Sequence, residues 1–283
     1  MNTPDPVELR VAFFGPAGTF TEEAARTHFA GAPVAFVAMR EIGEVLQAVA
    51  AGQADRGVVP LENSQEGTVN AALDGLVHDV ELSMVGEVIL PIRHMLLGAK
   101  GAKTEAIRLV RSHPQALAQC RSTLARLVPQ AALEAVTSTA WAAQSVQGDA
   151  TLAAVAPRVA AELYGLTVLA ESIQDSATNA TRFAVVGREP APPTGRDKTS
   201  IVFSFQGDRP GNLYEALGEF AQRDINLTKV ESRPARLELG RYLFFADCEG
   251  HREDQVVAEA LRALGRRCAK LTVLGSYPRA ANG

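Results

Sequence analysis

The sequence is short of cysteine. Its 283 residues include three cysteines, Cys120, Cys248 and Cys268. They form neither an even set nor a C-x-x-C pair, so they provide no disulfide framework and no spacing typical of a zinc site. So few cysteines fit a reducing compartment, and we therefore expect the protein in the cytoplasm.

A strong net charge is also missing. Lys and Arg number 28, and Asp and Glu number 32, which gives a formal net charge of -4. A protein whose main task is to bind nucleic acid needs a basic excess that neutralises phosphates, so this balance argues against nucleic acid as a partner. Hydrophobic residues make up 47% and charged residues 21% of the chain, as in an ordinary globular protein.

Long apolar runs are absent. The most apolar segment, 83–99, is interrupted by Glu87, Pro91, Arg93 and His94, so it does not supply the roughly 20 apolar residues of a membrane span. We interpret it as a long strand through a protein interior. The first ten residues lack the basic start and the apolar stretch of a signal peptide, so we expect neither membrane attachment nor export.

Apolar runs and helical patterns alternate along the first two thirds of the chain. The alternation extends from Leu9 to Gly187 and predicts a mainly parallel sheet in an α/β domain. The stretch 188–198 contains three prolines and a glycine, which do not continue a helix or a central strand. We therefore expect a first domain at 8–187, a linker at 188–198 and a second domain at 199–278.

The second domain has a strand-helix-strand-strand-helix-strand pattern. Strands are predicted at 199–205, 227–233, 242–249 and 271–276, and helices at 211–224 and 253–267. This βαββαβ order is typical of ferredoxin-like folds. An isolated unit of this kind has an exposed sheet edge and face, which pairing with a second chain would cover. We expect a dimer through these domains, doubled into a tetramer.

The segment Gly15-Pro-Ala-Gly-Thr-Phe20 follows a predicted strand and opens a helix. Thr19 and Glu22 have capping-box spacing, and a helix start of this kind can hold a carboxylate or a phosphate. The segment lacks the Gly-Lys-Ser/Thr of a P-loop and the third glycine of a dinucleotide fingerprint, so it supports neither cofactor. A plain tight turn is the alternative interpretation.

A polar segment, 62–68, follows the predicted strand at 57–60. It contains Glu62, Asn63 and Ser64, and ligand-binding loops of open α/β sheets gather at such places. Alternatively, Asn63 and Ser64 satisfy backbone groups of the loop and cap the next helix.

A helix start at 112–115 again has capping-box spacing. Gln119 lies seven residues after Ser112 on the same helical face, so this face could present neutral polar groups to a ligand. A polar surface face explains Gln119 almost as well, and His113 is either a general base or a structural residue. The segment 138–143 resembles another helix start, for which capping is the default interpretation.

The segment 175–183 collects hydroxyls, an amide, an aspartate and an arginine before an apolar strand. Arg182 offers a planar fork for a carboxylate, and Thr181 offers a neutral donor beside it. A surface loop with one arginine is the alternative interpretation. No Ser-His-Asp or metal-ligand spacing stands out in the sequence, which argues against a hydrolytic triad and against a metal site.

Taken together, these motifs resemble the prephenate dehydratase family from Val11 to Pro278. The second domain resembles the ACT regulatory domain, which in this family binds phenylalanine. Six motifs match in order, which is far more specific than any one of them: Gly15-Pro-Ala-Gly-Thr-Phe20, Pro60-Leu-Glu-Asn-Ser64 with Gly67-Thr68, Ser112-His-Pro-Gln-Ala-Leu-Ala-Gln-Cys120, Ser138-Thr-Ala140, Asn179-Ala-Thr-Arg-Phe183 and Glu231-Ser-Arg-Pro234.

The resemblance implies a catalytic domain of two α/β lobes, like a type II periplasmic binding protein, with the segment 82–97 crossing between the lobes and the substrate in the cleft. The implied reaction converts prephenate to phenylpyruvate with loss of carbon dioxide and the ring hydroxyl, on the route to phenylalanine. It needs no metal and no redox cofactor. Few residues precede the first predicted strand, so we expect no fused chorismate mutase domain and a single activity.

The resemblance also assigns roles to residues. Thr181 would donate a hydrogen bond or a proton to the leaving hydroxyl. Because an unperturbed threonine is a poor acid, Glu62 with a raised pKa is the alternative proton donor, and the sequence favours neither. The other assignments are positioning of the substrate by Asn63, Ser112 and Gln119, carboxylate binding by Arg182 and the Thr19 turn, and further substrate contacts by Ser64, Thr139 and Phe183.

In the ACT-like part, the family contacts phenylalanine at two places. They correspond here to the start of the first helix, with Gly211, Asn212 and Leu213, and to the end of the second strand, with Glu231, Ser232 and Arg233. Family members commonly carry alanine at the position of Asn212, so its amide could alter the affinity or the choice of effector.

Two alternatives stay open. Arogenate, which has an amino group where prephenate has a keto group, could be the substrate. A non-catalytic amino-acid sensor would use the lobed domain as a ligand trap and bind phenylalanine without turnover, although the intact Thr181-Arg-Phe183 stretch argues against it. If the ACT-like part only regulates, a chain ending at Arg188 should keep weak activity that phenylalanine no longer affects.

Overall fold

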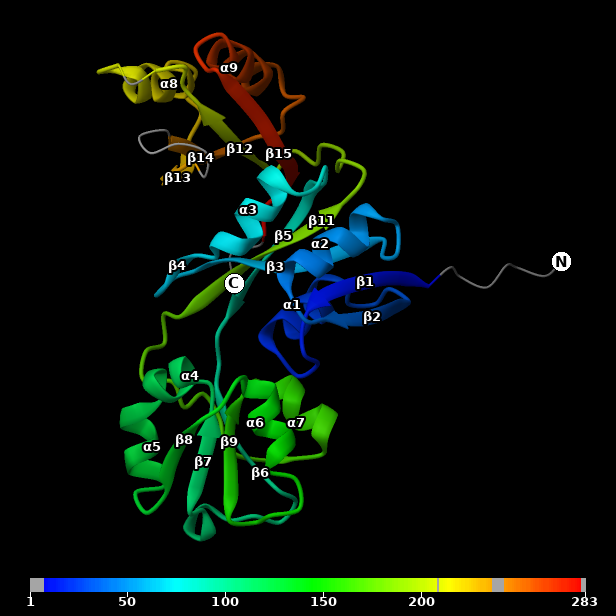
Figure 1. The fold of residues 1–283 in the computed structure, drawn as a ribbon, viewed down its shortest axis with the longest axis vertical. Coiled ribbons are helices and arrows are strands. Elements are labelled where there is room, and N and C mark those ends of the chain that lie inside the picture. Colours follow the sequence, from blue (N-terminus) through cyan, green and yellow to red (C-terminus); the bar gives the residue numbers. More distant parts are fainter. Residues whose placement is uncertain (1–7, 208, 236–241, 281–283) are drawn as a thin grey trace, which may run out of the picture.

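The computed structural model describes residues 8–207, 209–235 and 242–280, which form three β-sheets with their helices. Two sheets belong to the lobes of the first domain, and the third belongs to the second domain. The second domain and the second lobe lie at opposite ends of the molecule, with the first lobe between them (Figure 1).

The first lobe is built on a sheet in the order β2-β1-β3-β11-β5. Helix α1 packs on one face of this sheet, and α2 and α3 pack on the other. In α2 the buried residues Ile42, Val45, Leu46 and Val49 recur at helical spacing, which explains its apolar face. The elements are β1 (Leu9–Phe14), α1 (Phe20–His28), β2 (Val34–Met39), α2 (Ile42–Ala50), β3 (Arg56–Asn63), the short β4 (Gly67–Thr68), α3 (Asn70–His78), β5 (Ser83–Pro91) and β11 (Ala180–Gly187).

The second lobe has a sheet in the order β10-β6-β9-β7-β8. Helices α4 and α5 pack on one side of it, and α6 and α7 on the other. The elements are β6 (Met95–Gly98), a short 3-10 helix (Thr104–Ala106), β7 (Leu109–Ser112), α4 (Pro114–Gln119), α5 (Arg121–Leu127), β8 (Ala132–Ala135), α6 (Thr139–Ser145), β9 (Leu152–Ala156), α7 (Arg158–Tyr164) and β10 (Thr167–Ala170).

Two segments connect the lobes. The segment expected to cross, 82–97, does so as β5 in the first sheet and β6 in the second, with 92–94 between them. The chain returns through 171–179 and enters the first sheet as β11, antiparallel to both β3 and β5. Because β5 leaves the first lobe for the second and β11 returns from it, these neighbouring strands run in opposite directions. In the second sheet β6 is likewise antiparallel to β9 and β10. Both sheets are therefore mixed, and the expectation of a mainly parallel sheet was wrong.

The second domain confirms the predicted βαββαβ order. Its sheet has the order β13-β14-β12-β15 with antiparallel neighbours, and both helices pack on one face of it. The elements are β12 (Asp197–Ser204), α8 (Asn212–Ala221), β13 (Leu227–Pro234), β14 (Tyr242–Glu249), α9 (Gln255–Gly265) and β15 (Lys270–Pro278).

The other face of this sheet packs against the first lobe. Val202, Phe245 and Leu274 share one hydrophobic cluster with Met84 of β5 and with residues of α2 and α3. At Gly275 a Cβ atom would lie 2.2 Å from the carbonyl oxygen of Met84, so only glycine allows this approach. The sequence-based expectation that a second chain covers this face needs correction, because the chain's own first lobe already covers a large part of it.

Candidate active site

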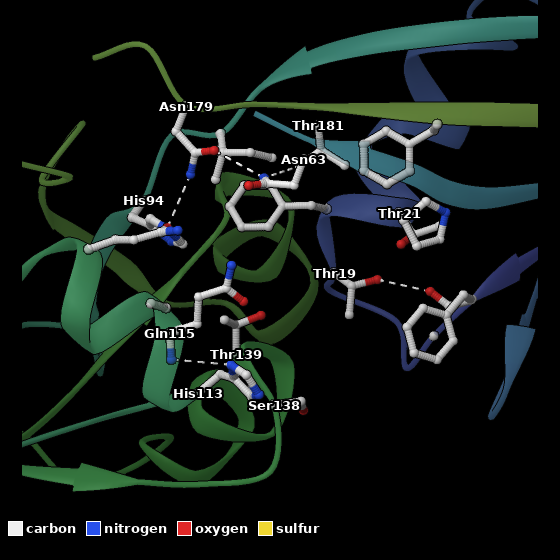
Figure 2. Close-up of a pocket in the computed structure, with 18 of the residues that line it drawn as sticks. Thr19, Thr21, Asn63, His94, His113, Gln115, Ser138, Thr139, Asn179 and Thr181 are labelled. Carbon is white, nitrogen blue, oxygen red and sulfur yellow. Dashed lines mark hydrogen bonds between the residues drawn. The ribbon is translucent and has the colours of Figure 1, made fainter. Parts of the chain in front are cut away.

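A cavity of about 310 Å³ lies between the two lobes, in the size range of small-molecule sites. Both lobes and the crossing segment 92–94 contribute to its wall (Figure 2). Among the described residues that line it there is no Asp, Glu, Lys or Arg. The lining residues are Phe14, Gly15, Thr19, Phe20, Thr21, Pro60, Asn63, Ile92, His94, His113, Gln115, Ala116, Gln119, Thr137, Ser138, Thr139, Asn179, Thr181 and Phe183.

Thr181 and Asn63 form the centre of the first-lobe wall. They lie opposite each other on the paired strands β11 and β3. Asn63 Nδ2 donates to Thr181 Oγ1 over 2.8 Å, while Asn63 Oδ1 accepts from the backbone N–H groups of Gln65 and Glu66. The loop bonds fix which end of the amide faces Thr181. Because Thr181 Oγ1 accepts from the amide, its own O–H can be donated to a ligand.

Gln119, at the end of α4, connects the second lobe to this wall. Its Oε1 accepts from Asn179 Nδ2 over 3.1 Å, and its Nε2 donates to Gln65 Oε1 over 3.0 Å. Asn179 Oδ1 in turn accepts from Asn63 Nδ2. A chain of neutral amides therefore extends from the second lobe to Thr181.

His94 is a site residue that the sequence analysis missed. It lies on the crossing segment, 3% exposed, with its ring edge-on to Phe20 and its Nε2 3.0 Å from Gln119 Oε1. Burial lowers the pKa of His94, although the hydrogen bond to Gln119 opposes this shift, so the ring is neutral at neutral pH. Since Oε1 is an acceptor, Nε2 carries the proton and donates to it. The sequence contained one indication of this role, because His94 is a polar residue that interrupts the apolar segment 83–99.

Two pairs of hydroxyls face the cavity from helix starts. Thr19 and Thr21 come from the beginning of α1, and Ser138 and Thr139 from the beginning of α6 (Figure 2). Ser138 caps α6 by accepting from the Trp141 N–H, as expected. Thr19 makes no side-chain cap, contrary to the capping-box expectation. Glu22 accepts from Gly18 N and pairs with Arg26 instead. Thr19 lines the cavity, and its hydroxyl donates to the Phe14 carbonyl over 3.4 Å.

Two predicted site residues are structural. Ser112 is completely buried and donates to the Val155 carbonyl, which ties β7 to β9. The cap of α4 comes from His113 Nδ1, which accepts from Gln115 N. Ser64 Oγ accepts from the Ala180 N–H and donates to the Thr178 carbonyl. Neither serine lines the cavity, because the hydroxyl of each satisfies nearby backbone groups.

Glu62 and Arg182 lie on the opposite side of the first-lobe sheet from the cavity. Glu62 pairs with Lys229 of β13 over 3.1 Å. Arg182 is 9% exposed and pairs with Glu87 and Asp247. Side chains alternate between the faces of a strand, so Thr181 and Arg182 cannot both point into the cavity. The structure therefore corrects both expectations: Arg182 is not placed to bind substrate, and Glu62 is not placed to protonate it.

Thr139 and Phe183, by contrast, line the cavity as expected.

The residues predicted to bind an effector separate into two groups. Gly211 has φ +90° and directly precedes α8, Asn212 Nδ2 donates to the Gly207 carbonyl, and Leu213 packs on the core of the second domain. On β13, Glu231 accepts from Thr68 and Arg233 pairs with Asp74, so both are engaged by the first lobe.

Ser232, between them, points to the opposite face of the strand. Glu231 and Arg233 are therefore interdomain contacts in this structure, which corrects their assignment as effector ligands.

Other chemistry is not apparent in the part of the chain that the structure describes. There, no three His, Cys, Asp or Glu residues come close enough to hold a metal ion, and no helix is long and apolar enough to cross a bilayer. The three cysteines are unpaired. Burial raises the pKa of Cys120 and Cys248 to about 12, so these thiols are poor nucleophiles at neutral pH.

Family models and a curated relative indicate the same family. The model of the prephenate dehydratase family matches residues 11–191, and that of the ACT domain matches residues 199–266. A prephenate dehydratase from Amycolatopsis methanolica is 46% identical; the match covers 96% of this chain and 89% of the relative.

Two solved structures have similar folds. One is a prephenate dehydratase from Arthrobacter aurescens in complex with L-Phe, with a TM-score of 0.86 and 41% identity; the match covers 96% of this chain and 90% of the other. The second is described as a novel type of quorum-quenching acylase, with a TM-score of 0.87 and 32% identity; the match covers 96% of this chain and 98% of the other.

Proposed function

The chain belongs to the prephenate dehydratase family, and we propose that the cavity between its lobes is where prephenate reacts. The activity is the decarboxylating dehydration of prephenate to phenylpyruvate, in the biosynthesis of phenylalanine. We assign catalysis to 8–187 and regulation to 199–278, joined by 188–198. The unpaired cysteines support a reducing compartment such as the cytoplasm.

The reaction makes modest chemical demands on the protein. The bond between the ring and its carboxylate breaks with release of carbon dioxide, the electrons of that bond enter the ring, and the ring hydroxyl departs with developing negative charge, which a proton from solvent neutralises to give water. Aromatisation supplies much of the driving force, so the enzyme must hold a dianion and assist the leaving hydroxyl. A cavity lined by neutral donors can meet both demands without a redox step.

Thr181 is the group that assists the leaving hydroxyl in our proposal. The single observation that carries this assignment is the bond from Asn63 Nδ2 to Thr181 Oγ1. It orients the threonine and leaves its O–H available as a donor, 8% exposed at the cavity wall. Such a preorganised donor acts in the transition state, when negative charge develops on the leaving oxygen.

The two carboxylates of the substrate need donors at both sides of the cavity. Thr21 from the first lobe and Ser138 and Thr139 from the second provide them. The Thr19 hydroxyl donates to the Phe14 carbonyl over 3.4 Å and would have to turn from it to join them. Neutral donors can hold a dianion when they are preorganised and the site excludes water. Phe183 supplies apolar contact for the ring.

The test of this function is incubation of the protein with prephenate, followed by the absorbance of phenylpyruvate in alkali. A parallel incubation with arogenate measures which of the two substrates has the higher kcat/KM. Binding of phenylalanine without turnover of either substrate would favour the sensor alternative and contradict the proposed site.

Replacing Gln119 by alanine is expected to lower kcat/KM about tenfold to a hundredfold, because the amide chain that positions Asn179 and Asn63 loses its central acceptor. Steady-state kinetics with prephenate measure the effect. Gln119→Glu is the matched variant, since it keeps the acceptor oxygen but adds a negative charge, and it should raise KM more than the alanine does. Wild-type kinetics in both variants would exclude Gln119 from the site.

We further propose that phenylalanine binds the ACT domain, as suggested by the Arthrobacter relative solved with L-Phe. Gly211 at the start of α8 and Ser232 on the outer face of β13 remain the candidates for contact. Exposed apolar residues on this domain, Tyr214, Val230 and Val256, support pairing with a second copy, and we propose a homo-oligomer.

Replacing Ser232 by alanine is expected to shift inhibition by phenylalanine to about tenfold higher concentration, because the hydroxyl is a candidate contact on the outer face of β13. Activity at increasing phenylalanine concentrations measures this shift. Thr228→Ala is the control, because Thr228 is also an exposed hydroxyl residue of β13, about 13 Å along the strand from Ser232. Equal inhibition curves for both variants would place the effector elsewhere.

A further inference from the structure

A buried cluster of charges joins the catalytic sheet to the ACT domain. Glu87 comes from β5 and Arg182 from β11, while Lys198, Asp247 and Tyr277 come from β12, β14 and β15. Each of the five residues is 9% exposed or less. The cluster lies on the opposite face of β11 from the cavity.

Arg182 is the centre of this cluster. Its Nε donates to Glu87 over 2.7 Å, one terminal nitrogen donates to Asp247, and the other donates to Tyr277 Oη over 2.6 Å. Lys198 Nζ donates to both oxygens of Glu87 over 2.9 Å. Every nitrogen of the guanidinium therefore has a partner, and two of the three partners belong to the ACT domain.

The charges in the cluster balance. Arg182 and Lys198 oppose Glu87 and Asp247, and Ser200 donates to Asp247. Burial by itself lowers the pKa of Arg182, but the carboxylates of Asp247 and Glu87 and the hydrogen bond to Asp247 raise it more, so the guanidinium stays charged. Burial and the nearby Asp247 raise the pKa of Tyr277, so its phenol keeps its proton. A balanced and fully bonded cluster tolerates burial, but loss of one member leaves an unpaired charge.

The cluster lies directly behind the proposed catalytic threonine. Arg182 follows Thr181 on β11, and the pairing of β11 with β3 becomes irregular at this point: Arg182 pairs with Glu62, but Phe183 pairs with Pro60, so Leu61 has no partner. Such a bulge bends the strand and weakens the ladder locally. On the other side of β11 the pairing with β5 is regular here, with Thr181 opposite Leu90 and Arg182 opposite Ile89. The β3 ladder is thus interrupted directly after Arg182, and the anchored guanidinium adds a restraint on β11 at this point.

We propose that Arg182 is a positioning residue for Thr181, and that the ACT domain supplies half of its anchor through Asp247 and Tyr277. The catalytic site is then complete only when the ACT domain is docked on the first lobe. This inference rests on the proposed role of Thr181.

The experiment compares Asp247→Asn with Asp74→Asn in the full-length chain. Both aspartates are buried at the interdomain boundary and pair with an arginine, but Asp74 lies on α3, which contributes no residue to the cavity lining among those described. We expect a similar loss of stability to urea in both variants. With prephenate, Asp247→Asn should lower kcat at least about tenfold and change KM less than about threefold. Asp74→Asn should stay within about twofold of the wild-type kcat.

A charge-balanced double variant separates positioning from folding. Arg182→Met with Asp247→Asn removes one charge of each sign and leaves the Glu87–Lys198 pair intact. Its urea midpoint should recover relative to Asp247→Asn, while kcat stays low. If Asp247→Asn does not fold, this double variant and Tyr277→Phe provide the measurement. Tyr277→Phe removes no charge and only the hydrogen bonds of the phenol to Arg182 and Ser200, and the expected loss in kcat is about threefold.

Three results overturn the inference: wild-type kcat in folded Asp247→Asn, equal losses of kcat in both aspartate variants, or full recovery of kcat in the double variant. Failure of the proposed function has a different signature. In that case, wild-type protein does not turn over prephenate, or Thr181→Val keeps its activity while Asp247→Asn loses it.

Discussion

Thr181→Val is expected to lower kcat for prephenate about a hundredfold or more and to change KM little. Valine has nearly the shape of threonine but no hydroxyl, so the variant removes the proposed donor to the leaving group. A loss of this size corresponds to about 2.7 kcal/mol or more of transition-state stabilisation, in the range for one preorganised donor. Steady-state kinetics with prephenate give kcat and KM separately.

The fold should survive this substitution. Without the hydroxyl, Asn63 Nδ2 still donates to Asn179 Oδ1 over 3.0 Å, so the buried amide keeps a partner. Thr199→Val is the matched control: it removes a fully buried threonine hydroxyl that bonds to the Gly250 carbonyl in the ACT sheet. This control should lower the urea midpoint and keep kcat. Near-normal turnover in folded Thr181→Val would remove Thr181 from the mechanism.

A chain that ends at Arg188 is expected to lose its cooperative fold, and with it all measurable activity. The sequence predicted weak residual activity, but the shared core changes this expectation. Removal of the ACT domain exposes Leu61, Leu73 and Met84, which are buried against Phe245 and Leu274. Full burial of three such side chains is worth up to about 5 to 9 kcal/mol, comparable with the net stability of a whole domain, about 5 to 15 kcal/mol.

Expression of residues 1–188 alone, with measurement of solubility and urea unfolding, tests this prediction. The exposed patch should direct the fragment into aggregates. Co-expression of residues 189–283 as a separate chain is the control, and it should restore soluble protein if the interface is the cause. A soluble fragment that unfolds cooperatively and turns over prephenate would show that the first lobe does not need the ACT domain.

Much of the fold could be predicted from local patterns. The helical spacing of Ile42, Val45, Leu46 and Val49 and the βαββαβ order after the proline-rich stretch follow from short-range periodicity. Strand direction could not be predicted in the same way. β11 returns from the other lobe and lies between β3 and β5. Its direction depends on that connection, which the pattern of its own eight residues does not show.

Among the site residues, too, some could be predicted from the sequence and others depended on the tertiary structure. Asn63, Gln119 and Thr181 were predicted, and they lie together at the cavity. His94 was missed because it belongs to the crossing segment, whose polar side chain meets Gln119 only when both lobes are assembled.

Ser112 was assigned to the substrate from the family resemblance, but its hydroxyl donates to the carbonyl of Val155, 43 residues away in the sequence.

The sequence by itself determined the family, the order of the elements and the residue types of a neutral polar site. Only the tertiary structure decided that Thr181 faces the cavity and that Arg182 faces the ACT domain. The physical reason is that β11 is buried on both faces: Phe183 and Val185 pack toward α1, and Ala184 and Val186 toward α2. A strand that is apolar on both sides has no hydrophobic alternation to show which face meets the ligand. That choice depends on what packs against each face, and for Arg182 the partners are residues 65 and 95 positions along the chain.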